Sequence, residues 1–537
     1  MYVYEYEDDI VIVDMGLQFP EEDMPGIDYL IPNVEYLRPR RKNIRGIIIT
    51  HGHYDHIGAI PHLMDALGNP PLYSTALTRG IILKRHEDFS HLKRPEIHVI
   101  TPESRLKLGS FAIEFFHVNH NIPDSVGVVL KTPIGTIVHT GDFKFDHSPV
   151  NERPADITRL SDLGRQGVLL LVSESTDAEM PGHQISETDV QKSLEEIFKA
   201  ASGRIIAATF SSLLTRVQQL IWLSEKYDRK VVIEGHSMKQ NVAVSQALGY
   251  LKVKKGTLIE SKNLGDLPDS RITIVCTGAQ GEDRAVLMRI ANNEHRTISL
   301  KPNDSIIFSS SVIPGNEATV QRLKDVLYKK AFKVYHYATM DIHSGGHAKR
   351  EELKMMINLT KPKFFIPIHG NYFMLKLHAE LATEAGVQRE HAMIAEDGDI
   401  VSVAPEQIKK LKETAPTDYV MVDGLGVGDV KEVVLRDRQH LAEDGIFVII
   451  AIVDSKSGRV RTSPDIISRG FIYLKESQEL LKEVRQRTRK IVEEITVSGT
   501  HPINWTHVKD ELREKVGQFL FNKTQRRPMV LPVVIEV

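Results

Sequence analysis

The sequence predicts a multidomain protein that combines α/β and α+β architecture. The first 140 residues form strand after strand, whereas buried strands alternate with amphipathic helices from about residue 186 onwards. The length supports the same conclusion, because 537 residues exceed one ordinary domain of about 100 to 200 residues and suggest three or four units. A change of pattern within one chain indicates separate domains.

The N-terminal block is predicted to consist of short strands, most of them bounded by Gly, Pro, Asn or Asp. Glu7-Asp8-Asp9 separates the first two strands and is typical of a hairpin turn. The expected strands are Val3 to Tyr6, Ile10 to Asp14, Ile44 to Thr50, Phe111 to Val118, Val126 to Lys131 and Thr136 to Thr140.

The middle block is predicted to be a parallel sheet covered on both faces, because continuous apolar strands alternate there with amphipathic helices. The expected strands are Arg204 to Phe210, Lys230 to Glu234, Ile272 to Thr277 and Ser305 to Ser309. The expected helices are Leu214 to Tyr227, Lys239 to Leu251, Asp283 to Asn292 and Glu317 to Lys330.

After about Lys333 the first pattern returns, with strands expected at Lys333 to Ala338 and Lys363 to Pro367. A less regular segment from about Pro405 to Asp444 leads into a small α+β domain. That domain is expected to contain a strand at Gly445 to Asp454, helices at Lys475 to Thr496 and Trp505 to Phe521, and a strand at Met529 to Val537.

Composition indicates a soluble globular protein, with 41% hydrophobic and 26% charged residues. We expect a cytoplasmic protein without a membrane segment, because no apolar stretch approaches about 20 residues and no signal-peptide pattern begins the chain. A single cysteine excludes a disulfide framework and a thiolate metal cage, so metals would be held by His, Asp and Glu. The net charge of −3 leaves the substrate undecided.

The segment from Thr50 to His56 packs three imidazoles and one carboxylate into six positions directly after a β-branched run. His51 and His53 share one side of an extended chain, whereas Asp55 and His56 face a second point one turn later. The segment could therefore serve two metal ions, and two ions about 3.5 to 4 Å apart suit phosphodiester cleavage. The alternative is a histidine-rich surface loop.

Further polar residues follow the ends of predicted strands, where the ligands of open α/β sheets gather. They are His120, Asp142, Glu174 and His369. Imidazoles suit zinc, and carboxylates suit zinc or manganese. Because one carboxylate placed between two ions can bridge them, Asp142 is the best candidate for the bridging ligand. Alone, Gly141-Asp142 would be read as a plain turn.

These residues carry a family resemblance. His51-x-His53-x-Asp55-His56, His120, Asp142 and His369 resemble the metal motifs of the metallo-β-lactamase fold, and Glu174, His347 and His369 resemble motifs of its nucleic-acid-processing β-CASP branch. Four segments resemble the ribonuclease J family in particular: Asn121 to Ser125, Thr140 to Asp146, Pro314 to Glu317 and Lys515 to Leu520. The resemblance covers essentially the whole chain.

The resemblance implies a metallo-β-lactamase αββα sandwich with an inserted β-CASP α/β domain and a small α+β C-terminal domain. An insertion accounts for the interruption and return of the first strand pattern. The implied division is 1–185 and 333–404 for the two parts of the sandwich, 186–332 for the insertion, 405–444 for a linker and 445–537 for the terminal domain.

The resemblance also implies roles in a site with two divalent ions, zinc or alternatively manganese. One ion would take His51, His53 and His120, the other Asp55, His56 and His369, with Asp142 between them. Glu174 would orient a histidine by accepting its distal N–H. His347 would contact the scissile phosphate or protonate the leaving oxygen, while a hydroxide activated by two metals attacks phosphorus.

The implied activity is that of a 5′-to-3′ exoribonuclease and endoribonuclease in rRNA processing and mRNA turnover. Its partner would be RNA, with a preference for a 5′-monophosphate, and the chain would form a homodimer or homotetramer. Two rivals remain: a metallo-hydrolase of small esters or lactams, and a catalytically silent RNA-binding subunit. The inserted block and His347 disfavour the first, and the intact ligand set disfavours the second.

The loop His343-Ser344-Gly345-Gly346-His347 could cradle an RNA phosphate, because small residues let backbone N–H groups approach an oxyanion. The alternative is a glycine-rich turn. Ribonuclease J usually reads His-Val-Ser-Gly-His here, so this chain has its serine one place earlier and an extra glycine. Family members also carry a glycine-rich first strand before the position of Met1, so an exposed strand edge is expected beside the site.

The resemblance raises one further site, a structural calcium ion on Gly26, Asp28 and Asp423. Oxygen ligands of this kind suit calcium. The alternative is that the acidic loop around Asp28 is merely solvated.

Overall fold

The computed structural model describes residues 1–21, 23–282, 284–313, 315–331, 333–497 and 503–537. They form two compact units, one of Met1–Leu17 with Pro32–Asp418 and the other of Gln18–Ile31 with Tyr419–Val537. The predicted helix start at Asp283, the Pro314 of the ribonuclease J-like motif and the predicted boundary at 332 lie outside the described residues.

Two sheets pack face to face in the larger unit. Their shared core joins Val11, Val13 and Ile48 of the first sheet to Phe111 and Phe115 of the second. The first sheet has the order β1 (Tyr2–Tyr6), β2 (Asp9–Val13), β4 (Ile44–Ile48), β5 (Leu72–Ser74) and β6 (Ile97–Val99). The second has the order β17 (Phe364–Ile368), β11 (Leu170–Glu174), β10 (Gly135–His139), β9 (Val126–Thr132), β8 (Phe111–His117) and β7 (Arg105–Leu108).

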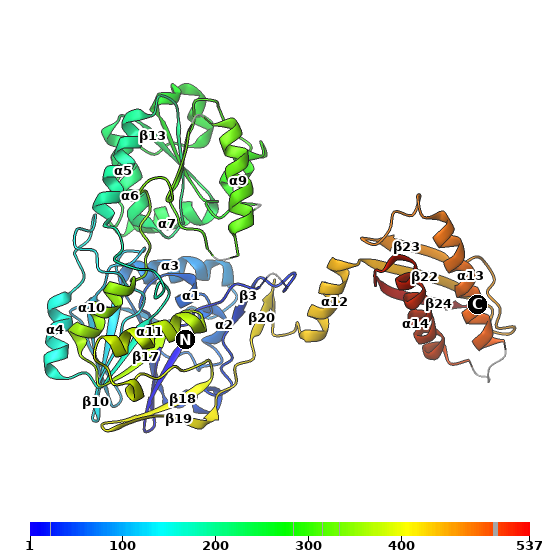
Figure 1. The fold of residues 1–537 in the computed structure, drawn as a ribbon, viewed down its shortest axis with the longest axis horizontal. Helices are drawn as coiled ribbons and strands as arrows, with labels where there is room; N and C mark the ends of the chain where they lie inside the picture. The colour runs from blue at the N-terminus through cyan, green and yellow to red at the C-terminus, as the bar shows by residue number, and fades with distance from the viewer. Residues whose placement is uncertain (22, 283, 314, 332, 498–502) are drawn as a thin grey trace. The chain divides into compact units, whose positions relative to one another are not determined.

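Helices complete this sandwich. Leu160, Leu353 and Leu381, one from each of three helices, pack in a core with Val129 and Val138 of the second sheet. The predicted αββα architecture is confirmed (Figure 1). The helices of the unit outside the inserted block are α1 (Tyr54–Ile57), α2 (Ile60–Leu63), α3 (Ala76–His86), α4 (Ile157–Gln166), α10 (Arg350–Thr360) and α11 (Tyr372–Glu384), and a hairpin of β18 (Asp399–Ala404) and β19 (Gln407–Thr414) follows them.

The inserted block is a fully parallel sheet, as predicted. Figure 1 shows α5 and α6 on one side of it and α9 on the other. The strand order is β13 (Lys230–Glu234), β14 (Ile272–Cys276), β12 (Ile205–Ala208), β15 (Ser305–Phe308) and β16 (Lys333–His336). The helices are α5 (Glu187–Ala200), α6 (Leu214–Lys226), α7 (His236–Ala247), α8 (Val286–Ala291) and α9 (Glu317–Lys330).

One strand lies in a different sheet from the one predicted. The strand expected from Lys333 was placed in the second part of the sandwich, but β16 pairs in parallel with β15 of the inserted sheet. The physical reason is the crossover helix α9 between them, since a strand that follows such a helix returns beside its predecessor. The domain boundaries given above stay predictions.

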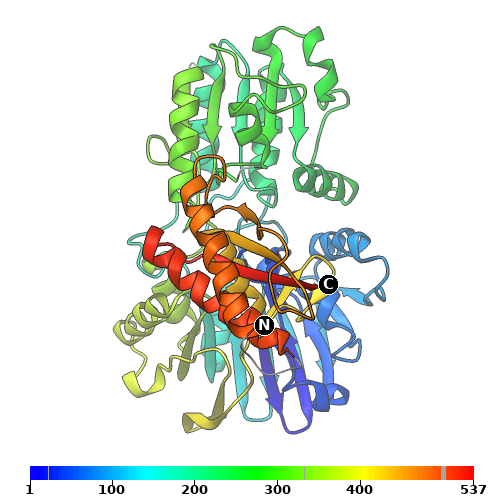
Figure 2. The same cartoon turned by 90° about the vertical axis from the view of Figure 1, so that its right-hand side faces the viewer.

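The smaller unit contains a three-stranded sheet that packs against two helices, α13 and α14 (Figure 2). The segment expected to be irregular, 405–444, is more regular than predicted, because it contributes β19, two short strands and a helix. The elements of the smaller unit are β3 (Tyr29–Ile31), β20 (Val420–Asp423), β21 (Gly426–Val427), α12 (Glu432–Glu443), β22 (Ile446–Val453), β23 (Asp465–Arg469), α13 (Gln478–Thr496), α14 (Trp505–Thr524) and β24 (Met529–Glu536).

The alternating pattern of β22, in which every second residue is buried, explains why this sheet has one covered face. In the part of the chain that the structure describes, no helix has the length and apolar character needed to cross a membrane.

Candidate metal centre

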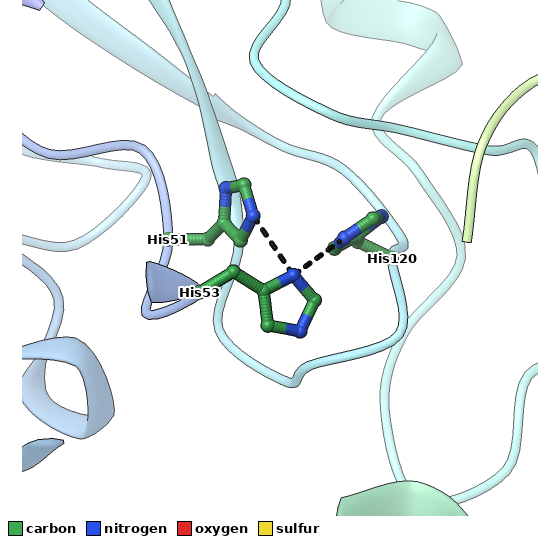
Figure 3. A group of neighbouring side chains, drawn as sticks. All are labelled: His51, His53 and His120. Carbon is green, nitrogen blue, oxygen red and sulfur yellow. Dashed lines mark hydrogen bonds between the residues drawn. The ribbon is translucent and has the colours of Figure 1, made fainter. Parts of the chain in front are cut away.

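Three imidazole nitrogens converge just beyond the end of β4. His53 Nδ1 lies 3.1 Å from His51 Nε2 and 3.1 Å from His120 Nε2 (Figure 3). Tetrahedral zinc with bonds of 2.0–2.1 Å would place its ligand nitrogens about 3.4 Å apart. The three nitrogens therefore have the spacing of ligands to one metal ion.

A second group gathers around the Asp142 carboxylate. Its Oδ2 lies 3.2 Å from His56 Nε2 and 3.5 Å from His369 Nε2, and Asp55 Oδ2 lies 3.6 Å from His56 Nε2. The same Asp142 oxygen is 3.8 Å from His51 Nε2 in the first group. Asp142 thus lies between the two groups, where a bridging ligand would lie.

Two atoms at the centre of this arrangement are buried without a hydrogen-bond partner among the described residues, His56 Nε2 and Asp142 Oδ2. An unsatisfied buried polar atom costs about 1 to 3 kcal/mol. Metal coordination would offset that cost, since both atoms are metal ligands by type. The residues present fit a pair of divalent ions, and the chain has a divalent-metal site.

The far sides of the ligand rings are held by fixed partners, which set tautomer and orientation. His56 Nδ1 lies 2.7 Å from Asp14 Oδ2, and His120 Nδ1 donates to Gly346 O at 2.7 Å. Asp14 also accepts from the Thr50 backbone N–H at 2.8 Å. Sequence reasoning missed Asp14, although the parallel pairing of its strand with the one before His51 could have indicated it.

His347 lies beside the second group and is held by Glu174. Its Nδ1 is 2.7 Å from Glu174 Oε2, and the other Glu174 oxygen accepts from the Phe143 backbone N–H at 2.7 Å. Burial by itself would lower the pKa of His347, but the Glu174 and Asp142 carboxylates raise that pKa to about 10. Burial lowers the pKa of His53 to about 4, which favours the neutral ring that binds metal.

The loop from His343 to His347 lies against the metal centre at its glycines. A Cβ on Gly346 would meet His120 Cε1 at 2.7 Å, and one on Gly345 would meet Gln184 Nε2 at 2.5 Å. Ser344 is buried, where its hydroxyl accepts from Lys144 Nζ at 2.9 Å and donates to Ile185 O at 2.7 Å. Close packing thus accounts for both glycines, and the phosphate cradle stays a prediction.

A buried ion network, which we define as Lys144, Glu187 and Arg216, supports this loop. Glu187 lies 2.6 Å from Arg216 Nη2 and 3.3 Å from Lys144 Nζ, and Arg216 also donates to Ile342 O. The network ties α5 and α6 of the inserted block to the segments that carry Asp142 and His347. Sequence reasoning missed it, because single charged residues in helices usually read as surface positions.

The residues of the predicted calcium site come together in the smaller unit. Asp28 accepts from the Gly424 backbone N–H at 2.8 Å, while Asp423 pairs with the Arg438 guanidinium. A Cβ on Gly26 would meet Arg438 Nη1 at 2.8 Å. The positive charge beside Asp423 is therefore that of an arginine, and the calcium site stays a prediction.

Comparisons with known proteins agree with this architecture. Four family models match in chain order: the metallo-β-lactamase superfamily over residues 1–200, the ribonuclease J β-CASP domain over 202–327, the Zn-dependent metallo-hydrolase RNA specificity domain over 339–394 and the ribonuclease J C-terminal domain over 433–537. The predicted combination of a sandwich, an inserted domain and a terminal domain is confirmed.

A crystal structure of a protein of unknown function from Enterococcus faecalis has a TM-score of 0.51 to this chain. At 17% identity, with 76% of this chain and 96% of that chain covered, the likeness shows the fold alone.

Full-length relatives are closer. Ribonuclease J 1 of Streptococcus pyogenes is 40% identical, with 99% of this chain and 94% of the relative covered. Ribonuclease J of Thermus thermophilus is 40% identical over 99% of this chain and 92% of its own length, and ribonuclease J2 of Bacillus subtilis is 36% identical over 100% and 96%. The chain therefore belongs to the ribonuclease J family of metal-dependent ribonucleases.

Proposed function

We propose that this chain hydrolyses RNA phosphodiester bonds, both internally and from the 5′ end, in rRNA processing and mRNA turnover. The observation that carries the proposal is the placement of two ligand groups around one shared carboxylate, Asp142, with His347 beside them. When bound, two divalent ions would supply Lewis-acid activation of water and stabilise charge on the scissile phosphate. Zinc is the proposed metal because imidazoles dominate the ligand set, and manganese is the alternative.

The proposed division of labour follows from the contacts of the chain itself. Asp142 joins the two ligand groups. Glu174 holds the Nδ1 side of His347, so the Nε2 side of that ring is left to face the substrate. His347 then contacts the scissile phosphate or delivers a proton to the leaving oxygen, which is a role suited to an imidazole.

The substrate is proposed to be single-stranded RNA with a 5′-monophosphate preference, held in part by the loop from His343 to His347. This loop meets the first ligand group directly, because the Gly346 carbonyl accepts from His120. A phosphate bound there would lie next to the proposed metals, where the scissile bond has to be placed.

We also propose that the chain assembles as a homodimer or homotetramer in the cytoplasm. The support is the outer face of the C-terminal sheet, where Ile467, Leu531 and Ile535 are 40%, 44% and 44% exposed. Apolar side chains gathered on one sheet face favour association with another copy. Analytical ultracentrifugation of the wild-type protein and of the Ile467→Glu variant tests this proposal. An unchanged oligomeric state in the variant would contradict the assignment of this sheet face to the contact between copies.

The function is tested by incubating the protein with 5′-monophosphorylated, triphosphorylated and circular RNAs in the presence of zinc or manganese. Cleavage of the circular RNA reports internal hydrolysis, and faster decay of the monophosphorylated RNA reports the 5′ preference. Turnover of small esters or lactams without RNA cleavage would favour the first rival activity. RNA binding without turnover would favour a silent binding subunit.

The His347→Ala variant separates the proposed catalytic role from a structural one. We expect the variant to keep its bound metal, measured by inductively coupled plasma mass spectrometry, while RNA cleavage is lost. The reason is that His347 is not assigned to either group of metal ligands. A large loss of metal would overturn the assignment.

A further inference from the structure

The metal centre is open on one side, and the exposure of its ligands shows which side. His56 and Asp142 are almost fully buried, whereas the side chains of Asp55 and His369 are 47% and 25% exposed. Asp55 Oδ2 and His369 Nε2 lie 3.8 Å apart, so the two exposed ligands share one opening. One route by which RNA can reach the centre therefore passes Asp55 and His369.

Exposed aromatic side chains border both of these ligands. Tyr54 precedes Asp55 and is 37% exposed, while Tyr372 and Phe373 follow His369 closely and are 56% and 46% exposed. Three residues of chain span at most about 11 Å, so Tyr372 cannot be far from the opening. We call these three side chains the aromatic rim.

The position of Tyr372 and Phe373 on α11 explains their exposure. The helix buries Leu375, His378 and Leu381 against the sandwich, so the residues at its start face outward. Two adjacent aromatic side chains at the start of α11 are therefore accessible from outside the protein.

One lysine accompanies the rim. Lys376 is exposed one helical turn after both Tyr372 and Phe373, on the same face of the helix. No ion pair of Lys376 is found in the part of the chain that the structure describes. Aromatic faces beside lysines are the groups that hold single-stranded nucleic acid without regard to sequence.

We propose that the aromatic rim stacks on the nucleobases that flank the scissile phosphate, and that Lys376 pairs with a neighbouring phosphate. This inference rests on the proposed function, because it names the part of the RNA that the opening recognises. Stacking is tolerant of base identity, since every base has a π face. The rim would therefore hold RNA of any sequence as the 5′ end advances into the site.

The test combines removal of aromatic rings from the protein with removal of bases from the RNA. The double variant Tyr372→Ala/Phe373→Ala and the wild type are each given a 5′-monophosphorylated RNA and the same RNA with abasic sites at its first nucleotides. We expect the double variant to lose about 10-fold in kcat/KM on the intact RNA and much less on the abasic RNA. Tyr372→Phe should retain activity, because the ring is kept.

Matched controls keep the test specific. Tyr328, which is also 56% exposed but lies on α9, gives the variant Tyr328→Ala, and we expect no loss on either RNA. Lys376→Ala should weaken binding of all sequences and make the slope of log affinity against log salt shallower by about 1. Metal content should stay at the wild-type value in every variant, because none of these side chains is a ligand.

The stacking role of the aromatic rim would be contradicted if the double variant lost kcat/KM equally on intact and abasic RNA, or on neither. A fall in bound metal would contradict it too. Failure of the proposed function looks different, since the wild type would then cleave neither RNA. If the wild type cleaves both RNAs and the double variant shows no selective loss on the intact RNA, the stacking role is rejected and the proposed function is not.

Discussion

One loop contributes to two buried polar regions, the metal centre through Asp142 and the buried ion network through Lys144. The polar atoms of the two regions differ in whether the chain itself supplies their hydrogen-bond partners. Asp142 and Lys144 are two residues apart, and both side chains are almost fully buried. The Asp142 Oδ2 has no hydrogen-bond partner among the described residues, whereas Lys144 Nζ is paired with Glu187 and Ser344. The metal centre is left unsatisfied by the chain, and the buried ion network is satisfied within it.

Hydrogen-bond satisfaction distinguishes ligand sites from structural sites in a buried polar region. An unsatisfied buried group destabilises the fold and is retained where something outside the chain pairs with it. A satisfied buried pair fixes the position of the segments that carry its members. Here the satisfied network positions the elements around the unsatisfied centre.

The largest effect is expected from Asp142→Ala, which removes the carboxylate shared by both ligand groups. We expect RNA cleavage to fall by more than the roughly 100-fold typical of residues one step removed from a metal, together with a loss of bound metal. Cleavage assays and mass spectrometry of metal content measure both. His147→Ala, at an exposed position shortly after Asp142, is the control, and retained cleavage in Asp142→Ala would remove the bridging role.

The buried ion network should show the opposite behaviour when it is broken. Arg216→Met leaves Glu187 buried without its closest cation, and we expect the free energy of unfolding to fall by about 3 to 5 kcal/mol with metal affinity per folded molecule retained. Urea denaturation measures the change. Asp189→Asn, which breaks an exposed pair with Lys192 on the same helix, should cost about 0 to 1 kcal/mol. Equal costs for the two variants would mean that the network is not structural.

The network should also make stability depend on pH in acid. Burial raises the pKa of Glu187 on its own, but Arg216 and Lys144 outweigh burial and lower that pKa from 4.5 to about 2. A carboxyl with a lowered pKa stabilises the fold fully above its ordinary pKa, and that stabilisation is lost as pH falls towards 2. We expect the difference in unfolding free energy between wild type and Glu187→Gln to shrink by about 3 kcal/mol across this range. A difference in unfolding free energy that stays constant with pH would contradict the lowered pKa of Glu187.

The sequence was informative about the metal centre because its ligand types are rare and their spacing is local. His51, His53, Asp55 and His56 lie within six positions, and the remaining ligands follow strands whose ends the apolar patterns predicted. The structure brings all of these side chains together.

The supporting residues could not be predicted in this way, because their role depends on tertiary pairing. Glu187 begins α5, where an acidic residue is ordinarily explained by the helix start. Arg216 lies in α6, which is buried on almost every side although its sequence reads as amphipathic. The strand β16 was misplaced for a related reason, since its local pattern suits either sheet.

The smallest effect concerns the loop whose sequence departs from the ribonuclease J pattern. Gly345 stands where that family usually has serine, and a Cβ there would meet Gln184 Nε2 at 2.5 Å. This amide donates to Asp177 and to the His347 carbonyl, so it is not free to move aside. We expect Gly345→Ser to cost about 1 to 3 kcal/mol of stability through overpacking.

A double-mutant cycle identifies the cause of that cost. Gln184→Ala alone should cost about 1 kcal/mol per lost hydrogen bond, but in that background Gly345→Ser should cost less than it does in the wild type. Urea denaturation of the four proteins measures the coupling. Additive costs would show that Gln184 does not occupy the space of a serine side chain at position 345. The altered loop would then need a different physical explanation. A double-variant cost smaller than the sum of the two single costs would mean that Gln184 supports His347 from the space that the family's serine side chain would take. The glycine and the glutamine would then be one adaptation.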